Sequence, residues 1–234
     1  EIVSLVGENG AGKSTLMNIL FGMAGIVNTG GYEGQIIWEG QPVQMVSPGQ
    51  AMNLGIGMVH QEFMLLPSYT VTENTKHNVV SRLVGSSMST LDRRHMKSDT
   101  KEALDKIHLK VDPSTVVGSM SVGYKQFVEI AREIDKKNIK LIVFDEPTAV
   151  LTDMESTWLL DTIREISAAG VAVIFISHKL DEVKNNTHHV FVLRDGEMVG
   201  DYHTADLSTV KMSQLMVGRE VEILNRERGH EEEN

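Results

Sequence analysis

The sequence predicts an α/β domain built on a mainly parallel β-sheet. Short apolar runs of strand length recur at residues 2–6, 56–59, 139–144 and 171–176. Segments with helical periodicity lie between these runs, and the first run leads directly into the glycine-rich loop GENGAGKS. Buried strands that alternate with helices form parallel sheets with helices on both faces, and such sheets bind ligands at the carboxyl ends of their strands.

Local patterns predict the elements of the first sixty residues. A strand at residues 2–6 is followed by the glycine-rich loop, and STLMNILF, residues 14–21, continues as a helix. Glycine punctuation around residues 35–46 predicts a pair of strands. Ser47-Pro48 starts a short helix, because proline is favoured at the first helical position, and residues 56–59 form a buried strand.

The middle of the chain predicts a helical lobe. From Thr70 to about Lys110 the residues are mostly polar or charged, which indicates a mostly helical insertion in the α/β core. An amphipathic helix follows from about Ser121, and its charged residues lie on the face opposite the apolar one. The apolar positions at i, i+3, i+4 and i+7 are Phe127, Ile130, Ala131 and Ile134. The charged run from Asp92 to Lys106 is expected to be a solvated helical face.

The carboxyl-terminal half repeats the alternation of strand and helix. Its predicted elements are, in order, a buried strand ending in acids at residues 139–147, a helix at 153–170, a buried strand at 171–178 and a hairpin at 190–200. Gly170 suits the end of the helix, and Asp195-Gly196 suits a tight hairpin turn. We expect one domain over residues 1–220, with a helical subdomain at about residues 70–135, and a linker or tail over residues 221–234.

Composition argues against several classes of function. The chain has 22 Lys and Arg against 32 Asp and Glu, a formal net charge of -10, so no nucleic-acid partner is expected. No run reaches the roughly 18 to 20 apolar residues of a membrane-spanning helix. Without cysteine there is no disulfide or thiolate metal site, which fits a cytosolic location. The pair His188-His189 is expected to be exposed and not to bind a metal, since no third ligand is near.

The glycine-rich loop matches the pattern G-x-x-x-x-G-K-S in the strand-to-helix context that phosphate binding requires. Glycines allow backbone amides to close around phosphate oxygens, and the helix N-terminus adds a partial positive charge. Lys13 would reach the β- and γ-phosphates, and Ser14 would hold Mg²⁺. The residues expected to bind the nucleotide here are Gly7, Glu8, Asn9, Gly10, Ala11, Gly12, Lys13, Ser14 and Thr15.

Two acids end the predicted strand in LIVFDEP. Asp145 is expected to bind Mg²⁺, directly or through water. Glu146 points elsewhere and could polarise the attacking water. Together with the glycine-rich loop, this pair indicates a P-loop NTPase.

Three further features depend on their order along the chain. Ser121 and Gly123 start a helix whose amide-rich end suits a phosphate. Gln61 comes just after a buried strand, and His178 ends the strand that follows the acids. Singly these are a helix cap, a loop glutamine and a polar strand end, but their order is specific.

In that order the motifs resemble those of the nucleotide-binding domain of ABC transporters, over residues 1 to about 220. GENGAGKST is similar to the Walker A motif, Gln61 to the Q-loop glutamine, MSVGYKQ to the signature, LIVFDEP to Walker B, and His178 to the switch histidine. YEGQIIWEG and DEPTAVLT are similar to the first ATPase half of the ATP-binding subunits of simple-sugar importers. Nucleoside importers look much the same.

The resemblance implies ATP hydrolysis coupled to transport, with ATP and Mg²⁺ as cofactors. The implied catalytic residues are Glu146 as general base, His178 at the γ-phosphate or the water, and Gln61 as the link between the metal and the helical lobe. The implied metal ligands are Ser14, Gln61 and Asp145.

The resemblance also implies partners. Ser121 and Gly123 would serve the nucleotide that is bound by a second ATPase domain. Transmembrane permease subunits and, indirectly, a substrate-binding protein complete the implied assembly. The expected location is therefore peripheral, on the cytoplasmic face of the membrane.

The chain departs from the family pattern in three places. Met120-Ser121-Val122-Gly123 stands where L-S-G-G is usual, with the second glycine kept, and Ala149-Val150-Leu151-Thr152 stands where S-A-L-D is common. The contact between domains that this aspartate makes is therefore not carried over. Because the phosphate loop comes so early, the antiparallel β subdomain is expected to be N-terminally truncated, and adenine is expected to be held weakly.

Alternatives to a sugar-importer ATPase remain open. One is a nucleoside-importer ATPase, and another is an ATP-binding regulatory module without useful hydrolysis, which the altered residues 149–152 suggest. A third is a soluble ABC ATPase that acts on ribosomes or DNA, and the acid excess argues against it.

Overall fold

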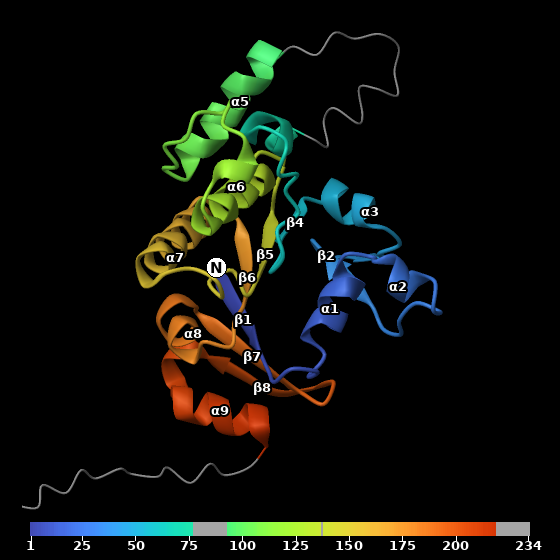
Figure 1. Ribbon diagram of the computed structural model, residues 1–234. Coiled ribbons are helices and arrows are strands. Elements are labelled where there is room, and N and C mark those ends of the chain that lie inside the picture. The colour runs from blue at the N-terminus through green and yellow to red at the C-terminus, as the bar shows by residue number, and fades with distance from the viewer. Residues whose placement is uncertain (77–92, 137, 219–234) are drawn as a thin grey trace, which may run out of the picture.

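The computed structural model describes residues 1–76, 93–136 and 138–218. A six-stranded sheet lies at its centre, with the strand order β4-β5-β6-β1-β7-β8 (Figure 1). The first five strands in this order are parallel, and β8 pairs antiparallel with β7. The strands are β1 (Ile2–Val6), β4 (Ile56–Val59), β5 (Leu141–Asp145), β6 (Ala172–Ile176), β7 (His189–Arg194) and β8 (Glu197–His203). The predicted mainly parallel α/β sheet is confirmed.

Helices cover both faces of this sheet (Figure 1). One core lies between the sheet and α6, α7, α8 and α9, and a second lies between the sheet and α1 and α3. Alternation along β5 sends Ile142 and Phe144 into the first core and Leu141 and Val143 into the second. The helices are α1 (Lys13–Leu20), α2 (Ala24–Val27), α3 (Pro48–Asn53), α5 (Arg93–Lys106), α6 (Val122–Ile134), α7 (Asp153–Ala168), α8 (Leu180–Asn186) and α9 (Thr209–Val217).

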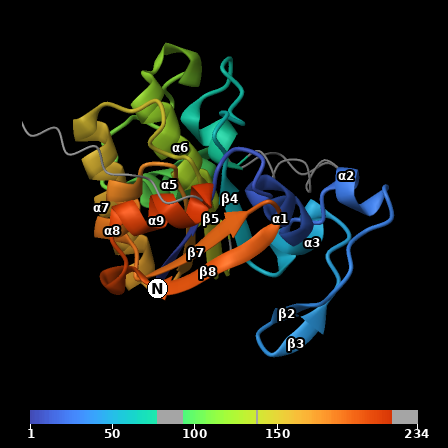
Figure 2. The same cartoon turned by 90° about the horizontal axis from the view of Figure 1, so that it is seen from below.

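A small antiparallel sheet confirms the predicted pair of strands around residues 35–46. It consists of β2 (Ile36–Trp38) and β3 (Gln41–Val43), with Ile36 opposite Val43. Figure 2 shows this hairpin standing apart from the main sheet.

The register of the main sheet brings the ends of four strands to one edge. Val59 at the end of β4 lies beside Phe144 in β5, and Phe144 lies beside Phe175 in β6. Leu5 in β1 lies beside Ile176, the last residue of β6. The segments that leave β1, β4, β5 and β6 therefore start at the same edge, as parallel pairing requires.

The charged face of α6 is largely buried. Glu129 is fully buried and Glu133 is 2% exposed, because α6 packs against both β4 and α5 and has little free surface on that side. Glu129 instead accepts a hydrogen bond from the backbone N–H of Met64, and Glu133 accepts one from that of Met58.

The expectation that His188 and His189 are both exposed is only half right. His188 is exposed, and its Nδ1 lies 3.1 Å from the backbone nitrogen of Ile2. The side chain of His189 is 21% exposed and pairs with Asp201 across the β7–β8 ladder. His188 thus contacts β1, and His189 contacts β8.

Some elements were not predicted, namely α2, α8 and α9. The predicted tail at residues 221–234 lies outside the described residues, as does part of the predicted helical lobe. Among the helices within residues 1–76, 93–136 and 138–218, none is both long enough and apolar enough to span a lipid bilayer.

Candidate functional site

The phosphate loop joins β1 to α1. Gly10 and Gly12 have φ values of 86° and 104°, a left-handed conformation that glycine adopts without a Cβ clash. Gly12 is the N-cap residue of α1 and has no side chain to cap it, so the first amides of the helix face the loop. Lys13 donates from Nζ to the carbonyl oxygens of Gly7 at 2.6 Å and Glu8 at 3.0 Å, which places its ammonium across the loop. The other expected phosphate-binding residues, Asn9, Ala11, Ser14 and Thr15, lie in the same turn and first helical residues.

The β7–β8 hairpin packs against this loop. A Cβ on Gly7 would lie 2.5 Å from the carbonyl oxygen of Leu193, so only glycine fits there. In the turn of the same hairpin, the N–H of Gly196 donates to the carbonyl oxygen of Ala11 at 3.1 Å. The loop is thus fixed by a segment almost two hundred residues away.

Glu146 and His178 are brought together at the carboxyl edge of the sheet. His178 Nδ1 lies 3.1 Å from Glu146 Oε2, where the glutamate side chain is 16% exposed and the histidine side chain 58%. Glu146 has a φ of 47°, uncommon for a residue with a Cβ, and its N–H donates to Ile176 at 2.9 Å. The backbone conformation turns this carboxylate away from the direction of β5, toward the loop after β6.

Asp145 ends β5 in a partly buried position. Burial, and next the negative charge of Glu146, raise the pKa of the Asp145 carboxyl group, while His60 and Lys13 act in the opposite direction. The influence of Lys13 indicates that the phosphate loop and this acid share one electrostatic environment.

The oxygen donors at this edge fit a magnesium ion. A carboxylate whose charge is disfavoured by burial and by a neighbouring carboxylate gains from a cation. The hydroxyl of Ser14, the carboxylate of Asp145 and the amide oxygen of Gln61 are hard oxygen ligands, which Mg²⁺ combines with water and phosphate oxygens. No group of three or more His, Asp or Glu residues with metal-binding geometry occurs in the described part of the chain.

Gln61 is exposed and follows β4 by two residues. The register of β4 with β5 places it at the same edge as Asp145 and Glu146. His60 lies between β4 and Gln61. Burial lowers its pKa, while the negative charges of Glu133 and Asp145 act in the opposite direction. Its position beside the acids was not predicted, although it directly precedes Gln61 in the sequence.

A hydrogen-bonded network joins the segment after Glu146 to the segment after His178. The Lys179 ammonium donates to the Thr148 carbonyl at 3.0 Å, and the Thr148 hydroxyl donates to Glu182 at 2.7 Å. Lys179 and Glu182 are themselves paired at 3.2 Å. Thr148 is 1% exposed, so the network is anchored in the core. Sequence reasoning missed it, because its members are far apart in the chain.

Ser121 and Gly123 lie at a different place, at the start of α6. Ser121 is the N-cap residue of α6 but makes no capping hydrogen bond with its side chain. A Cβ on Gly123 would lie 2.1 Å from Glu155 Oε1, so this glycine packs directly against the first turn of α7. The structure therefore unites Lys13, Asp145, Glu146 and His178 with the end of β4, but gives no contact between Ser121 or Gly123 and the phosphate loop.

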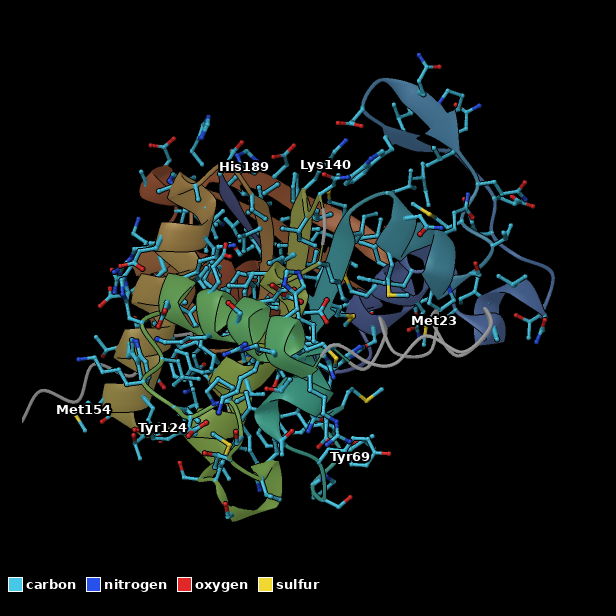
Figure 3. The ribbon with its side chains drawn as sticks, turned by 90° about the horizontal axis from the view of Figure 1, so that it is seen from above. Met23, Tyr69, Tyr124, Lys140, Met154 and His189 are labelled. Carbon is cyan, nitrogen blue, oxygen red and sulfur yellow. The ribbon has the colours of Figure 1, made fainter. Side chains whose placement is uncertain are left out.

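The surface around Ser121 exposes apolar side chains. Tyr124 is 42% exposed and Met154 is 82% exposed, and Figure 3 shows them on the same side of the molecule. Val122 and Val150 are also exposed, at 42% and 60%. Exposed apolar residues gathered in this way are typical of a contact surface.

Comparison with known proteins gives a consistent result. Residues 1–149 match the family model described as ABC transporter. The chain is 40% identical over 227 residues to a xylose import ATP-binding protein, XylG, of Photobacterium profundum, a match that covers 96% of this chain and 43% of that protein. It is 39% identical over 224 residues to a ribose import ATP-binding protein, RbsA, of Chelativorans sp., with 96% and 42% covered. The chain thus spans less than half the length of these curated relatives.

Solved structures share the fold. An ATP-binding cassette of an ABC transporter, MJ1267, has a TM-score of 0.78 at 24% identity, covering 93% of this chain and 87% of that one. The cbiO1 protein of Clostridium perfringens, described as part of the ABC transporter complex cbiONQ, has a TM-score of 0.72 at 25% identity, covering 88% and 78%.

Proposed function

Because this chain belongs to the ABC transporter family, we propose that it is the ATP-binding and ATP-hydrolysing domain of an importer for simple sugars. The observation that carries the proposal is the pairing of Glu146 with His178 beside the phosphate loop. The two relatives named for xylose and ribose import support a simple sugar as the cargo.

Each side chain at the sheet edge has a chemical task in this proposal. The amides of Gly7 to Thr15 and the ammonium of Lys13 bind the phosphates of ATP. Glu146 accepts a proton from the attacking water, and His178, whose Nδ1 lies 3.1 Å from Glu146 Oε2, orients that carboxylate and contacts the γ-phosphate. The oxygen donors of Ser14, Asp145 and Gln61 would hold Mg²⁺, which would neutralise negative charge on the phosphates.

The position of Ser121 and Gly123 supports a second ATPase domain as partner. These residues present the amide-rich start of α6 away from the phosphate loop of their own chain. In the proposed assembly they cover the nucleotide of the partner domain, and the exposed apolar residues around Tyr124 and Met154 lie in that contact. Permease subunits at the membrane and a substrate-binding protein complete the importer, with this domain peripheral on the cytoplasmic face.

A Glu146→Gln substitution tests the assigned base. We expect kcat for ATP hydrolysis to fall by about a hundredfold or more, because the amide cannot accept the proton. The affinity for MgATP should stay close to that of the unaltered domain. Asp181→Asn, an exposed acid on α8, is the matched control and should keep full turnover. Unchanged turnover in Glu146→Gln would rule out this base.

Transport itself is tested with the full-length protein. Reconstituted in vesicles with its permease and binding protein, it should accumulate a simple sugar only when ATP is present. A regulatory module would bind ATP and associate without any accumulation, and a nucleoside importer would accumulate nucleosides instead.

A further inference from the structure

The segment that carries Gln61 has an unusual support. β4 is the outermost strand of the sheet, and after Val59 the chain runs through residues 60–66 without helix or strand. Backbone amides and carbonyls that lack a neighbouring strand need other partners, or their burial costs free energy.

Side chains of α6 supply these partners. Glu129 Oε1 accepts the N–H of Met64 at 2.6 Å, and Arg132 Nη1 donates to the carbonyl of the same residue at 3.0 Å. Arg132 Nη2 also lies 3.3 Å from Glu129 Oε1, so the two side chains, one turn apart, form one unit. Both polar backbone groups of Met64 are thus bound to α6.

The same arrangement recurs two residues later. Asn74, in the helical lobe, accepts the N–H of Leu66 at 2.7 Å and donates to its carbonyl at 3.1 Å. Asn74 is 2% exposed, so this contact is buried. The chain after Gln61 is therefore fixed to the helical lobe through its backbone at alternate residues.

Glu129 occupies this position at a cost. Its side chain is fully buried, and among the described residues its second oxygen, Oε2, has no hydrogen-bond partner. An apolar side chain would avoid that cost, but it would leave the Met64 N–H without its acceptor and would remove one of the two carboxylates that pair with Arg132. The role of the Glu129 carboxylate is thus to bind the Met64 N–H and the Arg132 guanidinium.

The backbone is held in place on both sides of Gln61. On one side Val59 is fixed to the sheet by pairing with Phe144, and on the other Met64 is fixed to α6. Gln61 lies between them, two residues from one and three from the other. Any displacement of α6 against the sheet therefore moves Gln61.

We propose that Glu129 and Arg132 are positioning residues for ATP hydrolysis, which hold Gln61 in register with α6, the helix that starts at Ser121 and Gly123. Gln61 then reaches the metal and the water only when the start of α6 is correctly placed. The inference rests on the proposed function, because it assigns the two residues a role in that same site.

A double-mutant cycle tests this coupling in the full-length protein assembled with its membrane subunits. The variants are Glu129→Ala, Gln61→Ala and the combination of both. We expect Glu129→Ala to lower kcat by about 10- to 100-fold with KM for ATP nearly unchanged, and to raise the Mg²⁺ concentration for half-maximal rate. In the Gln61→Ala background, Glu129→Ala should have almost no further effect, since both act through one group.

Two milder variants and one control keep the test independent of folding defects. Glu129→Gln keeps an oxygen acceptor for Met64 and should recover most of kcat. Arg132→Lys loses the second donor of the guanidinium and should show the same pattern with a smaller loss. Val128→Ala is the control, because Val128 is a fully buried side chain on the same helix that has no polar group to bind Met64 or Arg132. Its effect should multiply with that of Gln61→Ala.

Hydrogen exchange gives a readout that does not need turnover. The Met64 amide should exchange faster in Glu129→Ala and at the original rate in Val128→Ala. Multiplicative effects of Glu129→Ala and Gln61→Ala on kcat, or a normal Met64 exchange rate in Glu129→Ala, would overturn the inference alone. A Gln61→Ala variant with normal kcat would also overturn the inference alone, whereas an unaltered protein without ATP hydrolysis would overturn the proposed function and the inference together.

Discussion

At the scale of single residues, burial strongly perturbs the carboxyl group of Glu129. Burial raises its pKa from 4.5 to about 7, and the negative charge of Glu133 acts in the same direction. The Met64 N–H and the positive charge of Arg132 oppose this rise without cancelling it. The proton is therefore bound more tightly in the folded protein than in the unfolded chain.

This difference predicts a pH dependence of stability. Because the pKa of Glu129 is higher in the folded protein, protonation of this carboxyl group contributes to the free energy of unfolding. This contribution is fully present below pH 4.5 and is lost as the pH rises through 7. The free energy of unfolding of the unaltered domain should fall by roughly 3 kcal/mol relative to Glu129→Gln between pH 4.5 and pH 8. Urea titrations of both proteins across this range measure it.

Glu73 provides a control of opposite sign. Hydrogen bonds from the backbone and side chain of Thr70 lower the pKa of this exposed carboxyl below 4.5. Its contribution is present above pH 4.5 and is lost as the pH falls below it, so Glu73→Gln should matter only at the acid end. Parallel curves for Glu129→Gln and the unaltered domain would contradict the assigned environment of Glu129.

At the scale of elements, α6 and α7 are joined by one side chain. Glu155 forms a capping box with Thr152 at the start of α7, in which the Thr152 N–H donates to the carboxylate at 3.0 Å. The same carboxylate lies against Gly123 in the first turn of α6. The start of each helix therefore depends on the same group.

This shared group predicts non-additive stabilities. Thr152→Ala should cost about 1 kcal/mol through loss of the cap. Gly123→Ala should cost a similar amount, because its methyl group displaces the Glu155 carboxylate. The double variant should cost clearly less than the sum. Thr157→Ala, an exposed position within α7, is the control, and denaturant unfolding is the measurement. Strictly additive costs would show that the two helix starts are independent.

At the scale of the whole molecule, much of the fold was predictable because it follows from local patterns. The strands around residues 2–6, 56–59 and 171–178 were recognised from apolar runs, and the site residues from motifs that carry their own geometry. The buried side of α6 was not, since Glu129 and Glu133 look like surface residues until β4 and α5 are placed against them. Contacts between distant segments, such as Thr148 with Glu182, leave no periodic signal in the sequence.

The arrangement of the whole molecule also predicts association. Nucleotide should drive two copies of this domain together, because the phosphate loop and the start of α6 face different partners. In Glu146→Gln, which keeps ATP, sedimentation with MgATP should show a dimer and without it a monomer. Ser121→Arg should abolish the dimer and preserve nucleotide binding, whereas Ser98→Arg, on the exposed surface of α5, should do neither. A dimer that forms equally well with Ser121→Arg would contradict this arrangement.

The attachment of Met64 and Leu66 through their backbones bears on how the sequence can diverge. At Met64 and Leu66, Glu129, Arg132 and Asn74 bind the backbone N–H and C=O groups, which every residue except proline possesses. The side chains of Met64 and Leu66, 60% and 39% exposed, take no part in it. Substitution at these two positions can therefore accumulate and change the outer surface, while the path of the backbone beside Gln61 stays the same.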